Sequence, residues 1–321
     1  MKRLDPFLTS LICAVLLASF LPCPPSLQPW LSRLTSLLVT LMFFFQGAKL
    51  QRHAIVESLQ DWRLQGATLI MSFGVFPLIG LGLFALCHVI FPNGLLKPDL
   101  WTGVLFLCCL PSTVQSSIAL TSIARGNVPA SICAATVSNI LGILFTPLLA
   151  GLLLHRSDSG SGLGTIIDVS RELLLPFIIG QLVQRWVGPI VKKHKVLLSF
   201  TDRGSIIVMV YAAFSAAVLQ GLWHRIPLIQ LGEVAVLDSL LLAIILGLTA
   251  ALGRLMGQTI ENDISLQFCG SKKSLATGVP MASVIFPSGA GIVVLPLMLF
   301  HQIQLFVCTV LARHYAQRPN S

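Results

Sequence analysis

The amino-acid sequence predicts an all-α membrane protein with ten transmembrane helices. Of its 321 residues, 55% are hydrophobic and only 10% are charged, whereas a soluble domain is about a quarter charged. The apolar runs recur at lengths near the roughly 20 residues that a helix needs to cross a bilayer. Two of these runs are interrupted by glycine or proline and by polar side chains. Backbone of that kind is tolerated at bilayer depth only where it is buried in protein or lines a wet cavity.

The expected spans follow one another with short connections. We place them near residues 6–21, 34–45 with flanking residues, 66–90, 100–124, 129–154, 173–187, 205–222, 234–255, 266–287 and 289–311. The basic start at Met1–Arg3 could instead mark the first run as a signal peptide. No small-residue cleavage site precedes Cys23, so a first span is favoured.

A polar loop at residues 155–164 separates two halves, which we take as a first five-helix repeat at 1–154 and a second at 155–321. Because five is odd, the two repeats have opposite topology. The interrupted spans are then the fourth and the ninth, in equivalent places. Paired interrupted helices in matching halves are the best sequence indication of a binding site near the bilayer midplane.

The basic residues predict the orientation. The chain has a formal net charge of +9, and its Lys and Arg residues lie in short loops, where they set topology. We therefore expect no nucleic-acid partner. The side of the termini carries Lys2, Arg3, Lys49, Arg52, Arg63, Arg125, Arg185, Lys192, Lys193, Lys195, Arg203, Arg254, Arg313 and Arg318, and the other side only Arg33, Lys97, Arg156, Arg171 and Arg225. Both termini are therefore expected in the cytoplasm.

The ninth span contains the sharpest candidate site. Its interruption is Gly270-Ser271-Lys272-Lys273-Ser274, preceded by Gln267. A lysine at bilayer depth costs about 3 kcal/mol even on lenient scales. Either lysine could reach an interface or pair with helix carbonyl groups. Alternatively, one ammonium group takes the place of a sodium ion or attracts an anionic substrate, and proton exchange at Lys272 could couple transport.

The fourth span breaks at Pro111, and polar side chains follow at once. They are Ser112, Thr113, Gln115, Ser116 and Ser117. An isolated Ser or Thr often bonds a preceding carbonyl of its own helix. A cluster directly after a proline break favours contact with an ion or a substrate. Asp238 is expected at the start of the eighth span, where a carboxylate suits the helix dipole.

Five stretches carry a resemblance to a known family: LDPF, FFFQGAKL, LCCLPSTVQSSIALTSIARGNVPASICAA, FCGSKKSLATGVPMASVIFP and LPLMLFHQIQLFVCTVLAR, between residue 4 and about residue 313. In these motifs the sequence resembles the bile acid–sodium symporter superfamily, specifically its bacterial SBF-like branch. The resemblance implies a panel domain from spans 1, 2, 6 and 7 and a core domain from spans 3–5 and 8–10. It also implies that spans four and nine cross at their unwound centres near two sodium sites, in a bacterial inner membrane.

The resemblance places possible Na⁺ contacts at Ser116, Ser117 and Ser131, with Thr136 as a further candidate. The better-studied branch has a carboxylate in span nine, where this chain has Phe268 beside Gln267. Lys272 stands where that branch has a glutamine. These departures put coupling to two sodium ions in doubt.

The function that we expect is secondary active transport, by alternating access, of an organic anion or a similar small metabolite. Coupling to Na⁺ or H⁺ is expected, with no other cofactor. The alternative is a membrane receptor or regulatory protein that binds a small ligand without transporting it. An enzyme is not expected, because the sequence has no HExxH, GxSxG or paired aspartates at depth.

Overall fold

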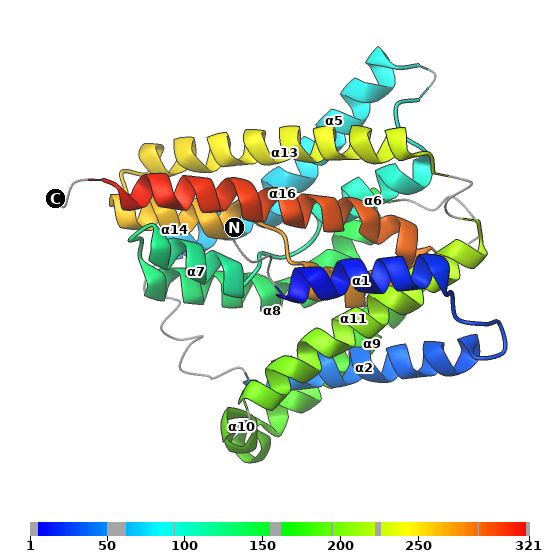
Figure 1. Ribbon diagram of the computed structural model, residues 1–321. Coiled ribbons are helices and arrows are strands. Elements are labelled where there is room, and N and C mark those ends of the chain that lie inside the picture. The colour runs from blue at the N-terminus through cyan, green and yellow to red at the C-terminus, as the bar shows by residue number, and fades with distance from the viewer. Residues whose placement is uncertain are drawn as a thin grey trace. The chain divides into compact units, whose positions relative to one another are not determined.

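The computed structural model describes residues 6–49, 62–92, 94–154, 162–193, 195–221, 226–287 and 289–318. Every element within these ranges is helical (Figure 1). The helices are α1 (Pro6–Phe20), α2 (Gln28–Lys49), α4 (Trp62–Leu69), the π-helix η1 (Ile70–Val75), α5 (Phe76–Ile90), α6 (Pro98–Cys108), α7 (Gln115–Ile123), α8 (Val128–Leu153), α9 (Gly162–Leu182), α10 (Gln184–Lys193), α11 (Lys195–Leu219), α13 (Leu228–Leu255), α14 (Ile260–Gly270), α15 (Leu275–Ile285) and α16 (Ala290–Ala316).

The all-helical membrane class is confirmed. Among the described residues, five helices are long and apolar enough to cross a membrane: Gln28–Ala48, Trp62–Ile90, Val128–Leu153, Leu228–Leu255 and Ala290–Ala316. Shorter apolar helices cover Thr9–Phe20, Pro98–Cys108 and Arg203–Leu219. The relation of the two sequence halves as inverted repeats stays a prediction. The basic start at residues 1–5 and most of the polar loop, at residues 155–161, lie outside the described residues.

Both expected interruptions are confirmed. The first break lies between α6 and α7, at residues 109–114, and the second between α14 and α15, at residues 271–274. The expected sixth span was placed wrongly at residues 173–187. Helix α9 begins at Gly162 and ends at Leu182, and the amphipathic α10 follows as a separate helix. Because α9 begins with polar residues and glycines, the apolar run that predicted this span starts later than the helix does.

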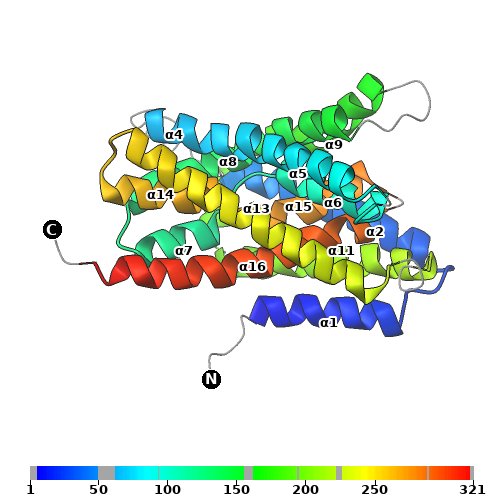
Figure 2. The same cartoon turned by 90° about the horizontal axis from the view of Figure 1, so that it is seen from above.

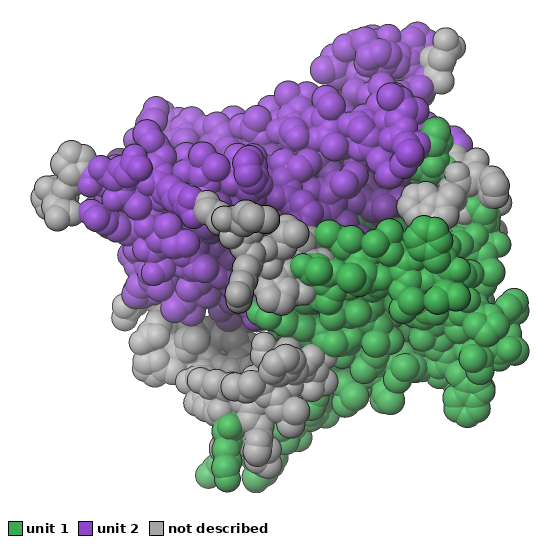
Figure 3. All heavy atoms as spheres, viewed as in Figure 1, with its two compact units in different colours: residues 1–51, 158–227, 279–294 green, residues 52–157, 228–278, 295–321 purple. Residues whose placement is uncertain are grey.

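The chain forms two compact units, which are coloured in Figure 3. Unit 1 consists of residues 1–51, 158–227 and 279–294, and unit 2 of residues 52–157, 228–278 and 295–321. Each unit therefore combines segments from both halves of the sequence.

In unit 1, α2 packs along α9, and α1 packs along α11 (Figure 1). The approach of α2 to α9 depends on two glycines. A Cβ atom on Gly47 would collide with the carbonyl oxygen of Phe177, and one on Gly180 with that of Phe44. The backbones of the two helices can touch because neither position carries a side chain.

Unit 2 is built around α8 and α14. Helix α14 packs against α4, α7, α8 and α13, and α8 packs against α4 and α7 (Figure 2). This arrangement brings the end of α6, residues 109–113 of the first break and the second break into the interior of one unit. All the candidate residues of the two breaks therefore lie in unit 2.

Candidate functional site

The second break is fully buried in unit 2. Lys272 and Lys273 both have 0% of their surface exposed. Neither side chain extends to the protein surface, so the alternative that a lysine reaches an interface is wrong, whereas the alternative that a lysine pairs with carbonyl groups holds for Lys273. The two ammonium groups instead have different surroundings.

The ammonium group of Lys273 is held by three backbone carbonyl groups. Its Nζ donates to the carbonyl oxygens of Ser72 at 2.8 Å, Cys108 at 2.8 Å and Leu110 at 2.7 Å. An ammonium group has three protons to donate, so all three are used. The ring of Phe76 covers the same group, with its centroid 4.0 Å from Nζ. We call the three carbonyl oxygens of Ser72, Cys108 and Leu110 the carbonyl site.

Local sequence explains why these carbonyl groups are available. In the π-helix η1 the N–H of Phe76 bonds to the carbonyl of Met71, five residues back. The carbonyl of Ser72 would then pair with the N–H of residue 77, but residue 77 is proline and has no N–H. Cys108 is the last residue of α6 and Leu110 lies in the first break. All three carbonyls therefore lack a helical partner and can accept from a side chain.

The other carbonyl groups of the first break are also satisfied, as buried backbone requires. The carbonyl of Cys109 accepts a hydrogen bond from the hydroxyl of Thr146 at 2.8 Å. The carbonyl of Pro111 accepts from the backbone N–H of Ser274 at 2.9 Å. The carbonyl of Ser112 accepts from the side-chain amide of Asn139 at 2.6 Å. The bond from Ser274 to Pro111 joins the two breaks directly. Each break thus fixes the conformation of the other.

Gln304 on α16 fixes the backbone of Lys273. Its side-chain oxygen accepts from the N–H of Lys273 at 2.9 Å, and its side-chain nitrogen donates to the carbonyl of Lys273 at 2.9 Å. Gln304 is fully buried and also contacts the ring of His301. The structure places Gln304 against the second break.

Lys272 has a different environment from its neighbour. Its Nζ has no hydrogen-bond partner among the described residues and lies 5.6 Å from the ring centroid of Phe268, within the range of a cation–π contact. The thiols of Cys269 and Cys308 are near enough to interact with it electrostatically. Lys272 is therefore the ammonium group that still has donors to offer.

The predicted hydroxyl residues are engaged with several different partners. Ser117 donates to the carbonyl of Phe268 at 2.9 Å, and Ser131 shares a hydrogen bond of 2.9 Å with Thr121. Ser116 and Thr113 bond to one another. Gln115 is exposed at the start of α7. These contacts link α7 to α14 and to α8 but do not gather the hydroxyls around one point.

Thr136 does not face either break. Its hydroxyl donates to the carbonyl of Ile132 in its own helix at 2.6 Å. The nearby Ser138, by contrast, accepts from the N–H of Ser112 at 3.0 Å. Ser138 lies seven residues after Ser131, on the same face of α8, and this spacing was the available signal.

The predicted residues around the second break hold its ends together. The hydroxyl of Ser271 donates to the carbonyl of Gln267, one turn back. The side chain of Gln267 donates to the carbonyl of Leu246 at 3.2 Å and accepts from Tyr315 at 2.7 Å. Gly270 ends α14, where it packs near Thr249 and Met71, and the hydroxyl of Ser274 accepts from the N–H of Thr277 at the start of α15.

The position of Asp238 within its helix differs from the expected one. It was expected at the start of a helix, but α13 already begins at Leu228, directly after Pro227, so Asp238 lies ten residues inside it. The side chain is fully buried, and neither carboxyl oxygen has a hydrogen bond of ordinary geometry. The dipole of the helix N-terminus, whose effect is limited to the first turn, does not reach it.

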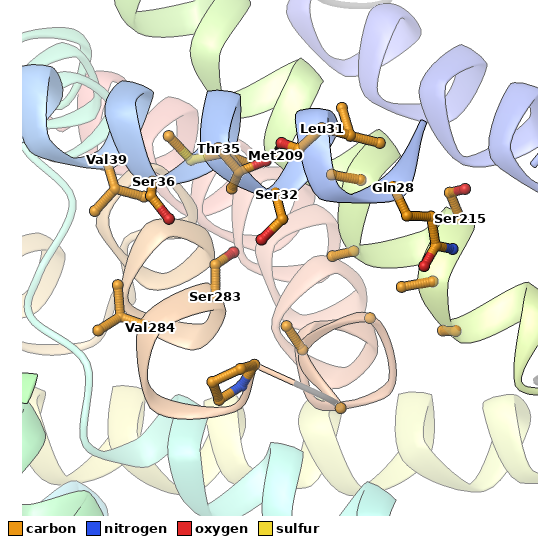
Figure 4. A pocket seen from close by; sticks show the side chains of 18 of the residues that line it. Gln28, Leu31, Ser32, Thr35, Ser36, Val39, Met209, Ser215, Ser283 and Val284 are labelled. Carbon is orange, nitrogen blue, oxygen red and sulfur yellow. Dashed lines mark hydrogen bonds between the residues drawn. The ribbon is translucent and has the colours of Figure 1, made fainter. Parts of the chain in front are cut away.

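Unit 1 contains a cavity of about 370 Å³ (Figure 4), a size typical of small-molecule sites. Its lining includes Ser32, Thr35 and Ser36 of α2, Ser215 of α11 and Ser283 of α15. Among the described lining residues there is no Lys or Arg, and Glu172 provides a carboxylate. Sequence reasoning missed this cavity. The signal was the row of small polar residues at 32, 35 and 36, which share one face of an otherwise apolar helix.

Comparison with known proteins gives a consistent result over the whole chain. The model of a family described as the SBF-like CPA transporter family matches residues 5–317. The uncharacterized protein PA2026 of Pseudomonas aeruginosa is 50% identical over 98% of this chain and 93% of its own length. YfeH of Escherichia coli, which carries the name of a candidate symporter, is 43% identical over 99% of this chain and 94% of its own. The sodium/bile acid cotransporter 7 of Rattus norvegicus is 25% identical over 85% of this chain and 80% of its own.

Proposed function

Because the chain belongs to the SBF-like CPA transporter family, we propose that it is a secondary active transporter that moves a small organic anion or a similar small metabolite by alternating access. Transport is coupled to a cation, Na⁺ or H⁺. The ten spans form two five-helix repeats of opposite topology in the bacterial inner membrane. Both termini are cytoplasmic, which the excess of Lys and Arg on that side supports.

The observation that carries this proposal is the carbonyl site around Lys273. Unwound backbone carbonyl groups in discontinuous helices coordinate the coupling cation in secondary transporters. Here three such carbonyl oxygens, at 2.7–2.8 Å, surround an ammonium group. Lys273 acts as a tethered cation in a site built for a monovalent ion, and Na⁺ competes with it or enters when it leaves.

The two lysines then have separate roles. Lys273 donates its three protons to backbone carbonyl groups, whereas Lys272 has no hydrogen-bond partner among the residues that the structure describes. The positive charge that attracts an organic anion is therefore that of Lys272. By itself, the cavity of unit 1, whose described lining residues include no Lys or Arg, offers hydroxyl and amide groups for hydrogen bonds to a small polar molecule.

Counterflow in proteoliposomes tests the proposal. Purified protein is reconstituted into vesicles loaded with one unlabelled organic acid, and uptake of the same labelled acid is followed across a panel of acids, with Na⁺ or choline and at two pH values. We expect a compound whose counterflow depends on Na⁺ or pH and is lost in Lys272→Gln. Uptake no faster than in empty vesicles across the panel, by protein that still unfolds cooperatively, would contradict transport.

A ligand-binding protein without turnover is the second candidate. The observation that favours it is that the described residues leave no carbonyl of residues 108–112 without a donor, which suits a site that does not open. Such a protein would gain thermal stability from a panel compound, as any ligand of the folded state provides. It would show no counterflow of that compound.

A further inference from the structure

Helix α10 (Gln184–Lys193) is too short to be a membrane span. Its 10 residues extend about 15 Å at about 1.5 Å per residue, which is half of a hydrocarbon core about 30 Å thick. The helix packs against α2, α9 and α11, all in unit 1. Figure 1 shows α10 nearly along its own axis but α2, α9 and α11 from the side, so α10 runs across the ends of these helices.

A glycine sets the depth of α10 relative to the membrane. Gly188 is buried, and a Cβ atom at this position would lie 3.5 Å from the carbonyl oxygen of Ala48. Ala48 is the last residue of the apolar span Gln28–Ala48. The contact therefore places α10 level with the end of a membrane span, where the hydrocarbon core meets the lipid headgroups.

The sequence of α10 is that of a helix at a membrane interface. In QRWVGPIVKK the apolar residues Trp186, Val187, Ile190 and Val191 recur at helical spacing. An amphipathic helix of this kind lies in the plane of the interface, with its apolar residues at the boundary of the acyl chains. Trp186 is 71% exposed, and tryptophan is enriched at the level of the headgroups. Contact with lipid explains why this large side chain lies on the protein surface.

The same helix carries a concentration of positive charge. Arg185, Lys192 and Lys193 belong to α10, and Lys195 begins α11. The sequence has no Asp or Glu at residues 173–201, so no acid of this segment neutralises them. The side chains of Arg185 and Lys193 are exposed. A cluster of basic residues on an amphipathic helix attracts anionic lipid headgroups.

From the placement and the charge of α10 we propose that this helix is a binding surface for the headgroups of anionic phospholipids. Arg185 and Lys193 bind the phosphate oxygens, and Trp186 packs at the boundary of the acyl chains. Because α10 joins α9 to α11 and contacts α2, the bound lipids hold the ends of these three helices at one depth in the bilayer. The proposal does not depend on the proposed transport, so the two can fail separately.

Quenching of tryptophan fluorescence by brominated lipids tests the proposal without any substrate. The full chain is placed in nanodiscs of phosphatidylcholine and phosphatidylglycerol at equal mole fractions, in which one of the two lipids is brominated near the headgroup end of its acyl chains. The chain has five tryptophans, so the emission of Trp186 is the difference between the parent and Trp186→Phe. We expect brominated phosphatidylglycerol to quench this emission more strongly than brominated phosphatidylcholine does.

Charge variants separate an anionic site from simple contact with lipid. Each basic residue near the surface changes the local concentration of anionic lipid by about fivefold, so Arg185→Gln/Lys193→Gln should lose most of the preference for phosphatidylglycerol. The control Arg33→Gln/Lys97→Gln removes the same charge from two exposed residues of other segments and should keep it. Quenching of Trp186 by neither lipid would overturn the placement of α10 at the membrane. Equal quenching by both lipids in the parent, or an unchanged preference in Arg185→Gln/Lys193→Gln, would overturn the anionic site.

Discussion

Replacing Lys273 with methionine removes the donor that three buried carbonyl groups share. A buried acceptor left without a partner costs about 1–3 kcal/mol, so the carbonyls of Ser72, Cys108 and Leu110 together lose about 3–9 kcal/mol. Removing a lysine charge from bilayer depth returns about 3 kcal/mol. The balance is a destabilisation between zero and about 6 kcal/mol, with a central value of about 3 kcal/mol.

Lys272→Met is the matched control. It removes the same charge from the neighbouring, equally buried position, but its Nζ has no hydrogen-bond partner, so no carbonyl is orphaned. The lost contact with the Phe268 ring costs about 0.5–2 kcal/mol, which the charge relief offsets. Lys272→Met should therefore be as stable as the parent or more stable.

The thermal unfolding midpoint of each variant, measured in one detergent at one scan rate, gives the comparison. At about 2 °C per kcal/mol for a large domain, the midpoint of Lys273→Met should lie about 6 °C below the parent. The reasoning is refuted if Lys272→Met falls as far as Lys273→Met, or further.

Two further substitutions test the packing of the breaks. Gln304→Leu should destabilise the chain by about 2–4 kcal/mol, because it leaves the N–H and C=O of Lys273 without partners. The control Gln302→Leu, on the same helix, should change stability by no more than about 0.5 kcal/mol. Equal unfolding midpoints for the two variants would contradict the role of Gln304 in fixing the second break. Gly142→Ala places a Cβ 2.6 Å from the ring of Pro111 and should cost about 1–3 kcal/mol. The Cβ atom added by Gly247→Ala meets nothing within 4 Å, so this variant should be more stable than the parent by about 0.5–1 kcal/mol. If both variants were more stable than the parent, the first break would have more room around Pro111 than the structure gives it.

The helix class and the two breaks could be predicted because they are properties of side chains along the chain. Pro111 interrupts one apolar run, and Gly270 with Lys272 and Lys273 interrupts another. The cost of a lysine in lipid is enough to predict that this second segment is buried in protein.

The identity of the binding lysine could not be predicted, because its partners are backbone carbonyl groups, which every residue has. The carbonyl of Ser72 is free only because a π-turn shifts the hydrogen-bond register by one residue onto Pro77. Pro77 is visible in the sequence, but the π-helical register that makes it leave this carbonyl without a donor is not. Gln304 stands far from the second break in sequence, and packing between helices brings it there.

The central claim is that Lys273 occupies a site for a monovalent cation, and ion-dependent thermal stability of Lys273→Ala tests it most directly. The unfolding midpoint is measured against increasing NaCl, methylammonium chloride and choline chloride, for the variant and the parent. A cation that binds only the folded protein raises stability as RT ln(1 + [L]/Kd). The account predicts a saturable rise with Na⁺ or methylammonium in Lys273→Ala, none with the bulkier choline, and a smaller rise in the parent, whose own ammonium fills the site. Equal midpoints in all three salts, or the same rise in the parent as in the variant, would contradict it.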